Sequence, residues 1–186
     1  MDQNQEVLLA EIREQARRTY ELGLDYWKEY SSINDLQFWI IVLMVIVPLV
    51  ILLIKIDTKD TLLLAFYGLN YHVWFAYTNS AGIKMGLWEY PFELLPILPS
   101  FALDASLVPV CYMLVYQWTL NHKKSFYFYS TLLSGILAFV FKPILVYFNF
   151  FRMFDGINYL HLFLFYIGFF LVSKGVTNIF LKIQKK

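Results

Sequence analysis

The chain has 186 residues, of which 59% are hydrophobic and only 16% are charged, and its mean hydropathy is +0.54. This composition is too apolar for an ordinary water-soluble domain, so the sequence predicts an integral membrane protein. The net charge is only +1, and no Lys- or Arg-rich stretch alternates with stacking aromatics outside an apolar run, which argues against nucleic acid as a partner. The single cysteine, Cys111, excludes an intrachain disulfide.

Residues 1–35 are predicted to form an acidic amphipathic helix outside the membrane. Apolar side chains recur there at three- and four-residue spacing, at Leu8, Ile12, Ala16, Tyr20, Leu24 and Trp27. The region has four basic and eight acidic residues, a balance that disfavours binding to anionic lipid. Two interpretations are open: the helix packs on the protein's own surface, or it binds a partner protein.

Residues 36–186 are predicted to form a bundle of five transmembrane helices, which makes the fold all-α. The predicted spans cover residues 36–54, 61–77, 99–120, 125–148 and 157–180, each about as long as the hydrocarbon core of a bilayer requires. The connection at 78–98 and the start of the third span contain three prolines, Pro91, Pro96 and Pro99. We expect a re-entrant or interfacial element there, with Trp88 and Tyr90 at the level of the lipid headgroups.

The basic residues predict the orientation in the membrane. Seven lysines fall on one side of a five-span bundle: Lys55, Lys59, Lys123, Lys124, Lys182, Lys185 and Lys186. The other side has only Lys84 and Arg152, together with the net-acidic amino-terminal region. The positive-inside rule therefore places the carboxyl terminus in the cytoplasm and the amino terminus outside, with the cell (plasma) membrane as the host.

Two ionisable side chains inside the predicted spans mark a candidate site. Asp104 and Lys142 lie roughly 8–9 Å below the same membrane boundary, at a rise of about 1.5 Å per residue on consecutive antiparallel helices. An unpaired charge at that depth is costly, so we expect the two residues to form an ion pair. The pair belongs to a binding or permeation site, or it only fixes the helix register.

Further polar residues are expected to gather around this pair under the outer surface: Glu89, Tyr90, Glu93, Asn149, Arg152 and His161. Asn70 and His72, deeper in the second predicted span, either extend the cluster inward or bond to their own helix. No GxSxG, Walker, HExxH or GxGxxG motif occurs, and no histidines have zinc-ligand spacing. The sequence therefore predicts no catalytic residue, no metal site and no cofactor.

The segment from Gly86 to Gln117, together with residues 141–143, resembles an uncharacterised family of small multi-spanning membrane proteins from spore-forming Firmicutes. The shared pattern is W-x-Y-P, then L-P, then an aspartate before P-V and Y-Q. It falls here on Trp88, Glu89, Pro91, Asp104, Pro109 and Gln117. In that family the residue before the later proline is often acidic, so Lys142 is a departure that makes the ion pair less general. The resemblance implies a topology and a host, and no activity.

The leading functional hypothesis is a non-enzymatic membrane protein with an outward-facing polar cavity, which handles or senses a small solute or ion. The alternative is an accessory or scaffolding subunit that docks a partner through its amino-terminal helix. A membrane-embedded enzyme ranks third. Five spans give a slim bundle, so transport would require self-association, by default as a dimer. Small residues expected to offer the packing face are Ser130, Ser134, Gly135 and Ala138.

Overall fold

The computed structural model describes residues 2–98 and 100–185, so Pro99 and Lys186, which entered the predictions above, lie outside the described residues. Helices dominate the chain, and the expected all-α class is confirmed. The α-helices are α1 (Gln3–Tyr30), α2 (Leu36–Lys55), α3 (Thr61–Lys84), α4 (Val108–Asn121), α5 (Phe126–Ile136), α6 (Lys142–Tyr147) and α7 (Tyr159–Gln184).

Two π-helical turns extend these helices into longer rods. η1 (Leu103–Leu107) precedes α4, and η2 (Leu137–Phe141) joins α5 to α6. In both places a proline follows within the first turn of the next helix, at Pro109 and Pro143. A proline has no N–H to donate and its ring clashes with the carbonyl four residues earlier, so regular α-helical bonding is interrupted there. A π turn, which bonds residues five apart, accommodates that interruption without ending the helix.

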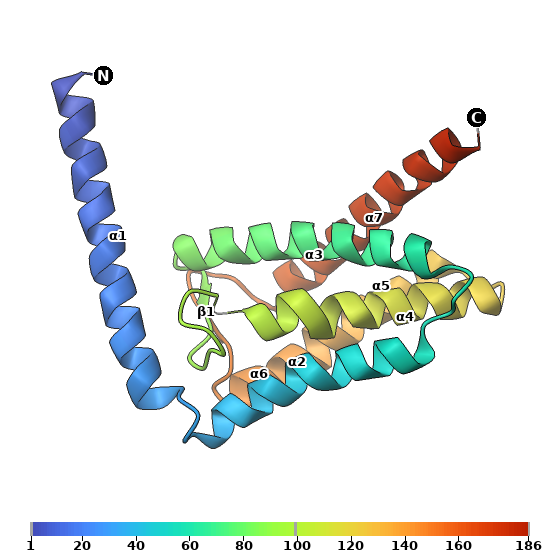
Figure 1. The fold of residues 1–186 in the computed structure, drawn as a ribbon, viewed down its shortest axis with the longest axis horizontal. Helices are drawn as coiled ribbons and strands as arrows, with labels where there is room; N and C mark the ends of the chain where they lie inside the picture. Colours follow the sequence, from blue (N-terminus) through green and yellow to red (C-terminus); the bar gives the residue numbers. More distant parts are fainter. Residues whose placement is uncertain (1, 99, 186) are drawn as a thin grey trace.

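Five helical rods pack against one another, and they are formed by α2, α3, η1 with α4, α5 with η2 and α6, and α7. Their arrangement can be followed in Figure 1. Their shared interior is aromatic. The ring of Tyr71 from α3 stacks on that of Tyr112 from α4, with 4.2 Å between centroids, and Tyr67 lies 4.9 Å from Tyr116. All four tyrosines are buried, so the contact between α3 and α4 forms the centre of the core.

Three of the rods are long and apolar enough to cross a membrane: α2, the continuous segment Phe126–Tyr147, and α7. α2 is the most apolar of them and exposes large side chains along most of its length, among them Leu43, Ile46 and Leu53. A contiguous apolar surface of this extent is rare on a soluble monomer. It is the surface that lipid covers on a membrane protein.

The connection after α3, predicted as a re-entrant or interfacial element, contains a short strand. Its two-residue strand β1 (Trp88–Glu89) pairs antiparallel with β2 (Arg152–Met153), and this ribbon covers one end of the bundle, called here the ribbon end. The turns at residues 56–60 and 122–125 lie at the opposite end. The side chains of Trp88, in β1, and Tyr90, which follows it, are buried in the bundle, where their polar atoms bond to Asn79.

Helix α1 projects away from the bundle in Figure 1 and contains no buried residue. Its hydrogen bonds to the rest of the described chain come from its last turn and the residue that follows. Trp27 Nε1 donates to the carbonyl of Glu93 at 3.0 Å, and the Ser31 hydroxyl bonds to both backbone groups of Glu93. Leu8 and Ile12 of the predicted apolar stripe are exposed, and Leu24 and Trp27 near the end of the helix are only partly buried. The helix therefore contacts the rest of the described chain at its end and does not pack along the protein's own surface.

The small residues of α5 and η2 are already used inside the bundle. Ser130, Ser134 and Ala138 are fully buried, and the Ser134 hydroxyl lies 2.7 Å from that of Tyr112. The expectation that these residues offer a face for self-association is therefore wrong, because α4 and α7 of the same chain occupy that face. Of the four residues proposed for this role, Gly135 alone is partly exposed.

Candidate functional site

A continuous hydrogen-bond network lies under the ribbon end, with Asn79 at its centre. The Asn79 side chain donates to Asp104 Oδ1 at 2.7 Å. Its oxygen accepts from the Trp88 indole N–H at 2.7 Å and from the Tyr90 hydroxyl at 3.1 Å. Tyr90 in turn accepts from Lys142 Nζ at 3.1 Å. The network therefore ties together α3, the connection that follows it, η1 and α6.

The charged members of this network are buried, and each has polar or aromatic partners. Asp104 is 6% exposed and Lys142 is 1% exposed. The second carboxylate oxygen of Asp104 accepts a hydrogen bond from the Ser100 hydroxyl, so both oxygens are bonded. The Lys142 ammonium also lies 3.4 Å from the centroid of the Phe151 ring, which supplies a cation–π contact. Buried charges are tolerated only with such partners.

The expected ion pair between Asp104 and Lys142 is not formed. The ion pairs of the described residues are Arg17–Glu21, Lys28–Asp25 and Arg152–Glu89. Asp104 and Lys142 are instead linked through Asn79 and Tyr90, which stand between them. The similar depths of the two charges can be predicted from the sequence, but the two neutral side chains that separate them cannot.

Exchanging the two charges is therefore not expected to restore stability. In the double variant Asp104→Lys/Lys142→Asp, the introduced aspartate faces the Phe151 ring, whose negative face repels an anion. The introduced lysine faces the donor groups of Asn79 and Ser100. We expect the double variant to melt no higher than Asp104→Asn alone when thermal unfolding is followed in detergent. Recovery in the double variant would demonstrate a direct pair.

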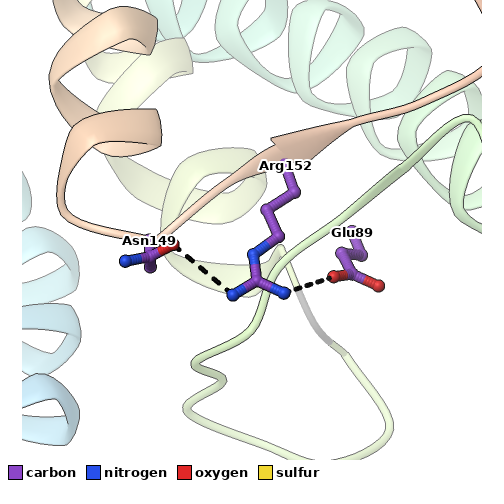
Figure 2. Close-up of polar contacts among 3 residues, drawn as sticks. All are labelled: Glu89, Asn149 and Arg152. Carbon is purple, nitrogen blue, oxygen red and sulfur yellow. Dashed lines mark hydrogen bonds and ion pairs between the residues drawn. The ribbon is translucent and has the colours of Figure 1, made fainter.

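Glu89 and Arg152 lie outside this network, on the ribbon. Figure 2 shows Arg152 donating to Glu89 Oε1 at 3.5 Å and to the side-chain oxygen of Asn149 at 3.4 Å. Both ion-pair side chains are about half exposed, at 51% and 47%. An exposed pair of this kind contributes about 0–1 kcal/mol. These residues brace the ribbon and do not contact Asp104 or Lys142.

His161 and Asn70 also have local partners of their own. His161 is exposed and forms a capping box with Asn158, whose side chain accepts from the His161 N–H at 3.3 Å while His161 Nδ1 accepts from the Asn158 N–H at 3.2 Å. This satisfies backbone groups at the start of α7. Asn70 donates to the carbonyl of Phe66 in its own helix at 2.9 Å. The structure thus separates both residues from the network.

A cleft of about 520 Å³ opens beside the network at the ribbon end. Its polar lining comes from His72, Ser80, Lys84, Ser100 and Asp104, and its apolar lining includes Ile83 and Phe101. His72 Nδ1 lies 2.7 Å from the backbone oxygen of Asp104, and because a carbonyl can only accept, Nδ1 must carry the proton. Nε2 of a neutral His72 is then an acceptor. Of the predicted site residues, His72 and Asp104 line this cleft.

Glu93 lies where α1 joins the bundle. Burial raises the pKa of Glu93 to about 7 from its ordinary value of 4.5, because a partly buried carboxylate loses hydration when it ionises. The backbone of the same residue holds Trp27 and Ser31. Ionisation of Glu93 therefore acts at the contact that anchors α1.

This raised pKa predicts a pH-dependent anchor. Between about pH 4.5 and pH 7 the native state binds more protons at Glu93 than the unfolded state does. The contribution of Glu93 to the free energy of unfolding is therefore fully present below that window and is lost as pH rises through it. We expect amide exchange at residues 27–35, corrected for its intrinsic pH dependence, to become faster across the window. Glu93→Gln should remove the effect and Glu29→Gln, an exposed control, should keep it. An unchanged profile in Glu93→Gln would assign it to another group.

A second lysine lies inside the bundle, nearer the opposite end. Lys174 of α7 is half-buried, donates to the Tyr116 hydroxyl, and lies 4.1 Å from the centroid of the Tyr116 ring. Lys174, Asn79 and Ser100 were not among the site residues predicted from the sequence. A signal for Asn79 was available, because Tyr71, Phe75 and Asn79 recur every four residues and so share one helix face.

Within the described ranges 2–98 and 100–185, no three His, Cys, Asp or Glu side chains are grouped so that they could hold a metal ion. No protein-family model matches the chain, and no curated protein or solved structure is significantly similar to it.

Proposed function

We propose that this protein is a five-span integral membrane protein that binds a small polar solute in the cleft beside Asp104, and so handles or senses that solute without catalysing a reaction. The observation that carries the proposal is the double role of Asp104. This residue lines the cleft, and its carboxylate is also one end of the buried network. A solute that bonds to Asp104 competes with Asn79 and Ser100, and its binding is thereby coupled to Tyr90 and Lys142.

Five spans require two further rods, α3 and η1 with α4, besides the three apolar ones. α3 has 24 residues and η1 with α4 covers residues 103–121, so the two rods are about 36 Å and 28 Å long, close to the thickness of about 30 Å of a hydrocarbon core. They are less apolar because they direct buried tyrosines into the bundle. We place the chain in the plasma membrane with its amino terminus outside, as the resemblance to the Firmicutes family and the lysine distribution suggest.

Cysteine labelling tests this topology. In a Cys111→Ala background, Glu14→Cys and Glu89→Cys are expected to react with a membrane-impermeant maleimide on intact cells. Lys123→Cys and Lys185→Cys should react only after permeabilisation, because the opposite end of the bundle carries the lysines. The reverse pattern would place the ribbon end in the cytoplasm, and equal labelling of all four positions on intact cells would contradict five spans.

Solute binding is tested on the purified full-length protein in detergent. Amino acids, polyols and inorganic cations are screened by tryptophan fluorescence, since Trp88 bonds to the network through Asn79. Ser80→Trp, which places a large side chain in the cleft from a residue outside the network, should weaken the response, and Asp104→Asn should abolish it. Asp155→Asn makes the same charge change at an exposed turn position and should respond normally. A response of unchanged size in Ser80→Trp would rule out the cleft.

Docking of a partner protein through α1 is a second candidate function, and the exposure of α1 favours it. Val7, Leu8, Ile12 and Leu22 are each at least 60% exposed. Deletion of residues 2–24 removes this surface while it keeps Trp27 and the Ser31 contact with Glu93. If the cellular phenotype depends on residues 2–24 and is indifferent to Asp104→Asn and Ser80→Trp, partner docking is the better account.

A further inference from the structure

A column of hydroxyl-bearing side chains occupies the interior of the bundle between the network and Lys174. Four helices contribute to it, and in each helix the contributing residues are four or seven positions apart, so they share one face. The members, all buried, are Tyr67, Tyr71, Tyr112, Tyr116, Ser130, Ser134, Tyr166, Ser173 and Thr177. We call this set the hydroxyl column.

Five hydroxyls of the column have no hydrogen-bond partner among residues 2–98 and 100–185: those of Tyr67, Tyr71, Ser130, Tyr166 and Ser173. A buried hydroxyl without a partner costs about 1–3 kcal/mol. Phenylalanine or alanine would fill much of the same space without that cost, so five such groups in one interior are unexpected for a purely apolar core. Water is the partner that buried hydroxyls without a protein partner commonly take.

At the ribbon end, the column meets the network at a small cavity. A space of about 20 Å³ is lined by Asn79, Tyr90, Lys142 and Tyr166, among others. This volume corresponds to room for about one water molecule, with several polar atoms around it. Tyr166, whose hydroxyl is one of the five, therefore borders the same cavity as the ammonium of Lys142.

At the opposite end, the column meets Lys174 and a second opening. Lys174 donates to the hydroxyl of Tyr116, and the ring of Tyr116 lies 4.9 Å from that of Tyr67. Thr177, one turn further along α7, is buried beside a cleft of about 520 Å³ that Asp60 also lines. The column therefore extends from one cleft region to the other.

The dimensions suit a path through a bilayer. The rise along α3 from Tyr67 to Asn79 is about 18 Å. In the middle of this stretch, the hydroxyl of Tyr112 lies 2.7 Å from that of Ser134, and its ring stacks on Tyr71. A cleft at each end shortens the remaining distance across a hydrocarbon core of about 30 Å.

We propose that the hydroxyl column holds a file of water molecules and conducts protons between the Asp104 end and the Lys174 end. At each step an oxygen accepts a proton along one hydrogen bond and releases another along the next, so the column returns to its starting composition and no oxidant or reductant is needed. This inference rests on the proposed five-span topology and is independent of solute binding.

Proton flux is measured with the full-length protein in phospholipid vesicles that contain a pH-sensitive dye. A potassium gradient with valinomycin provides the driving potential. We expect the internal pH to change faster than in protein-free vesicles. Tyr71→Phe and Tyr166→Phe each remove one oxygen and keep the ring, and both should slow the change several-fold. Tyr77→Phe, at an exposed position in the same helix as Tyr71, should leave the rate unchanged.

Stability supplies a second readout for the same variants. If Tyr71 is dry, its unpaired hydroxyl destabilises the protein and Tyr71→Phe raises the melting temperature. If water bonds to it, as we propose, the melting temperature stays unchanged or falls. Flux equal to that of protein-free vesicles, or flux that Tyr71→Phe and Tyr166→Phe do not alter, would overturn the proposal. Solute binding without proton flux would leave the proposed function standing and overturn only this inference.

Discussion

Asn79→Leu is expected to lower the free energy of unfolding by about 3 kcal/mol or more, since it removes the shared partner of three buried polar groups. These are the carboxylate of Asp104, the indole N–H of Trp88 and the hydroxyl of Tyr90. Leucine is similar in size to asparagine and offers neither a donor nor an acceptor, so all three groups lose a hydrogen bond at once. The change should be visible as a large fall in the melting temperature in detergent.

Asn70→Leu is the matched control for that substitution, in the same helix. Asn70 donates only to the carbonyl of Phe66, which already belongs to the helix, and its side chain is partly exposed. Leucine at this position leaves no buried group unpaired, so we expect a neutral or slightly stabilising effect. If both variants were equally destabilised, the loss would reflect α3 in general and the network would have no special importance.

A single added methyl group at Gly82 is expected to displace Trp88 from the network. A Cβ built at Gly82 would lie 1.9 Å from Cζ2 and 2.3 Å from Cη2 of Trp88, far inside van der Waals contact. The indole is buried and held by Asn79, so Gly82→Ala must break that hydrogen bond or move α3. Overpacking costs about 1–3 kcal/mol and the unpaired groups cost about as much again. Tryptophan emission should shift to the red as the melting temperature falls.

Other helical glycines provide graded controls. Gly168→Ala in α7 meets no atom within 4 Å, so the higher helix propensity of alanine should stabilise the protein by about 0.5–1 kcal/mol. Gly68→Ala brings Cβ within 2.3 Å of the sulfur of Met113, a flexible side chain that can move, and should be intermediate. Stabilisation by Gly82→Ala would show that Trp88 does not pack against α3.

Much of the fold and part of the site could be predicted from the sequence. Apolar runs of membrane length predicted the all-α class, and the depth of Asp104 and Lys142 placed both at the same end of the bundle. Hydropathy failed at Asn79, because it measures the average apolarity of a segment and the polar run after Tyr77 lowered it. α3 continues through that run to Lys84, and Asn79 is buried by the bundle.

The interactions that the sequence did not reveal are mostly long-range. β1 and β2 are two residues each and pair across more than sixty positions, and no local pattern in either segment predicts this pairing. The same applies to the contact of Trp27 with Glu93. The four-residue spacing of Tyr67 with Tyr71, and of Tyr112 with Tyr116, is visible in the sequence. The spacing does not indicate that these two helix faces meet in the interior, which the structure shows.

The π turns before Pro109 and Pro143 make the site sensitive to insertions and deletions. A π turn holds one more residue than an α turn, and one residue corresponds to about 100° of rotation about a helix axis. Deletion of Ala105 would restore α-helical winding in η1 and swing Asp104 away from Asn79, while the hydropathy of the segment stayed almost unchanged. The number of residues between this aspartate and the following Pro-Val pair therefore decides which way the carboxylate faces. Chains with the same spacing are expected to have an inward-facing carboxylate, and chains with another spacing only have an acidic residue nearby.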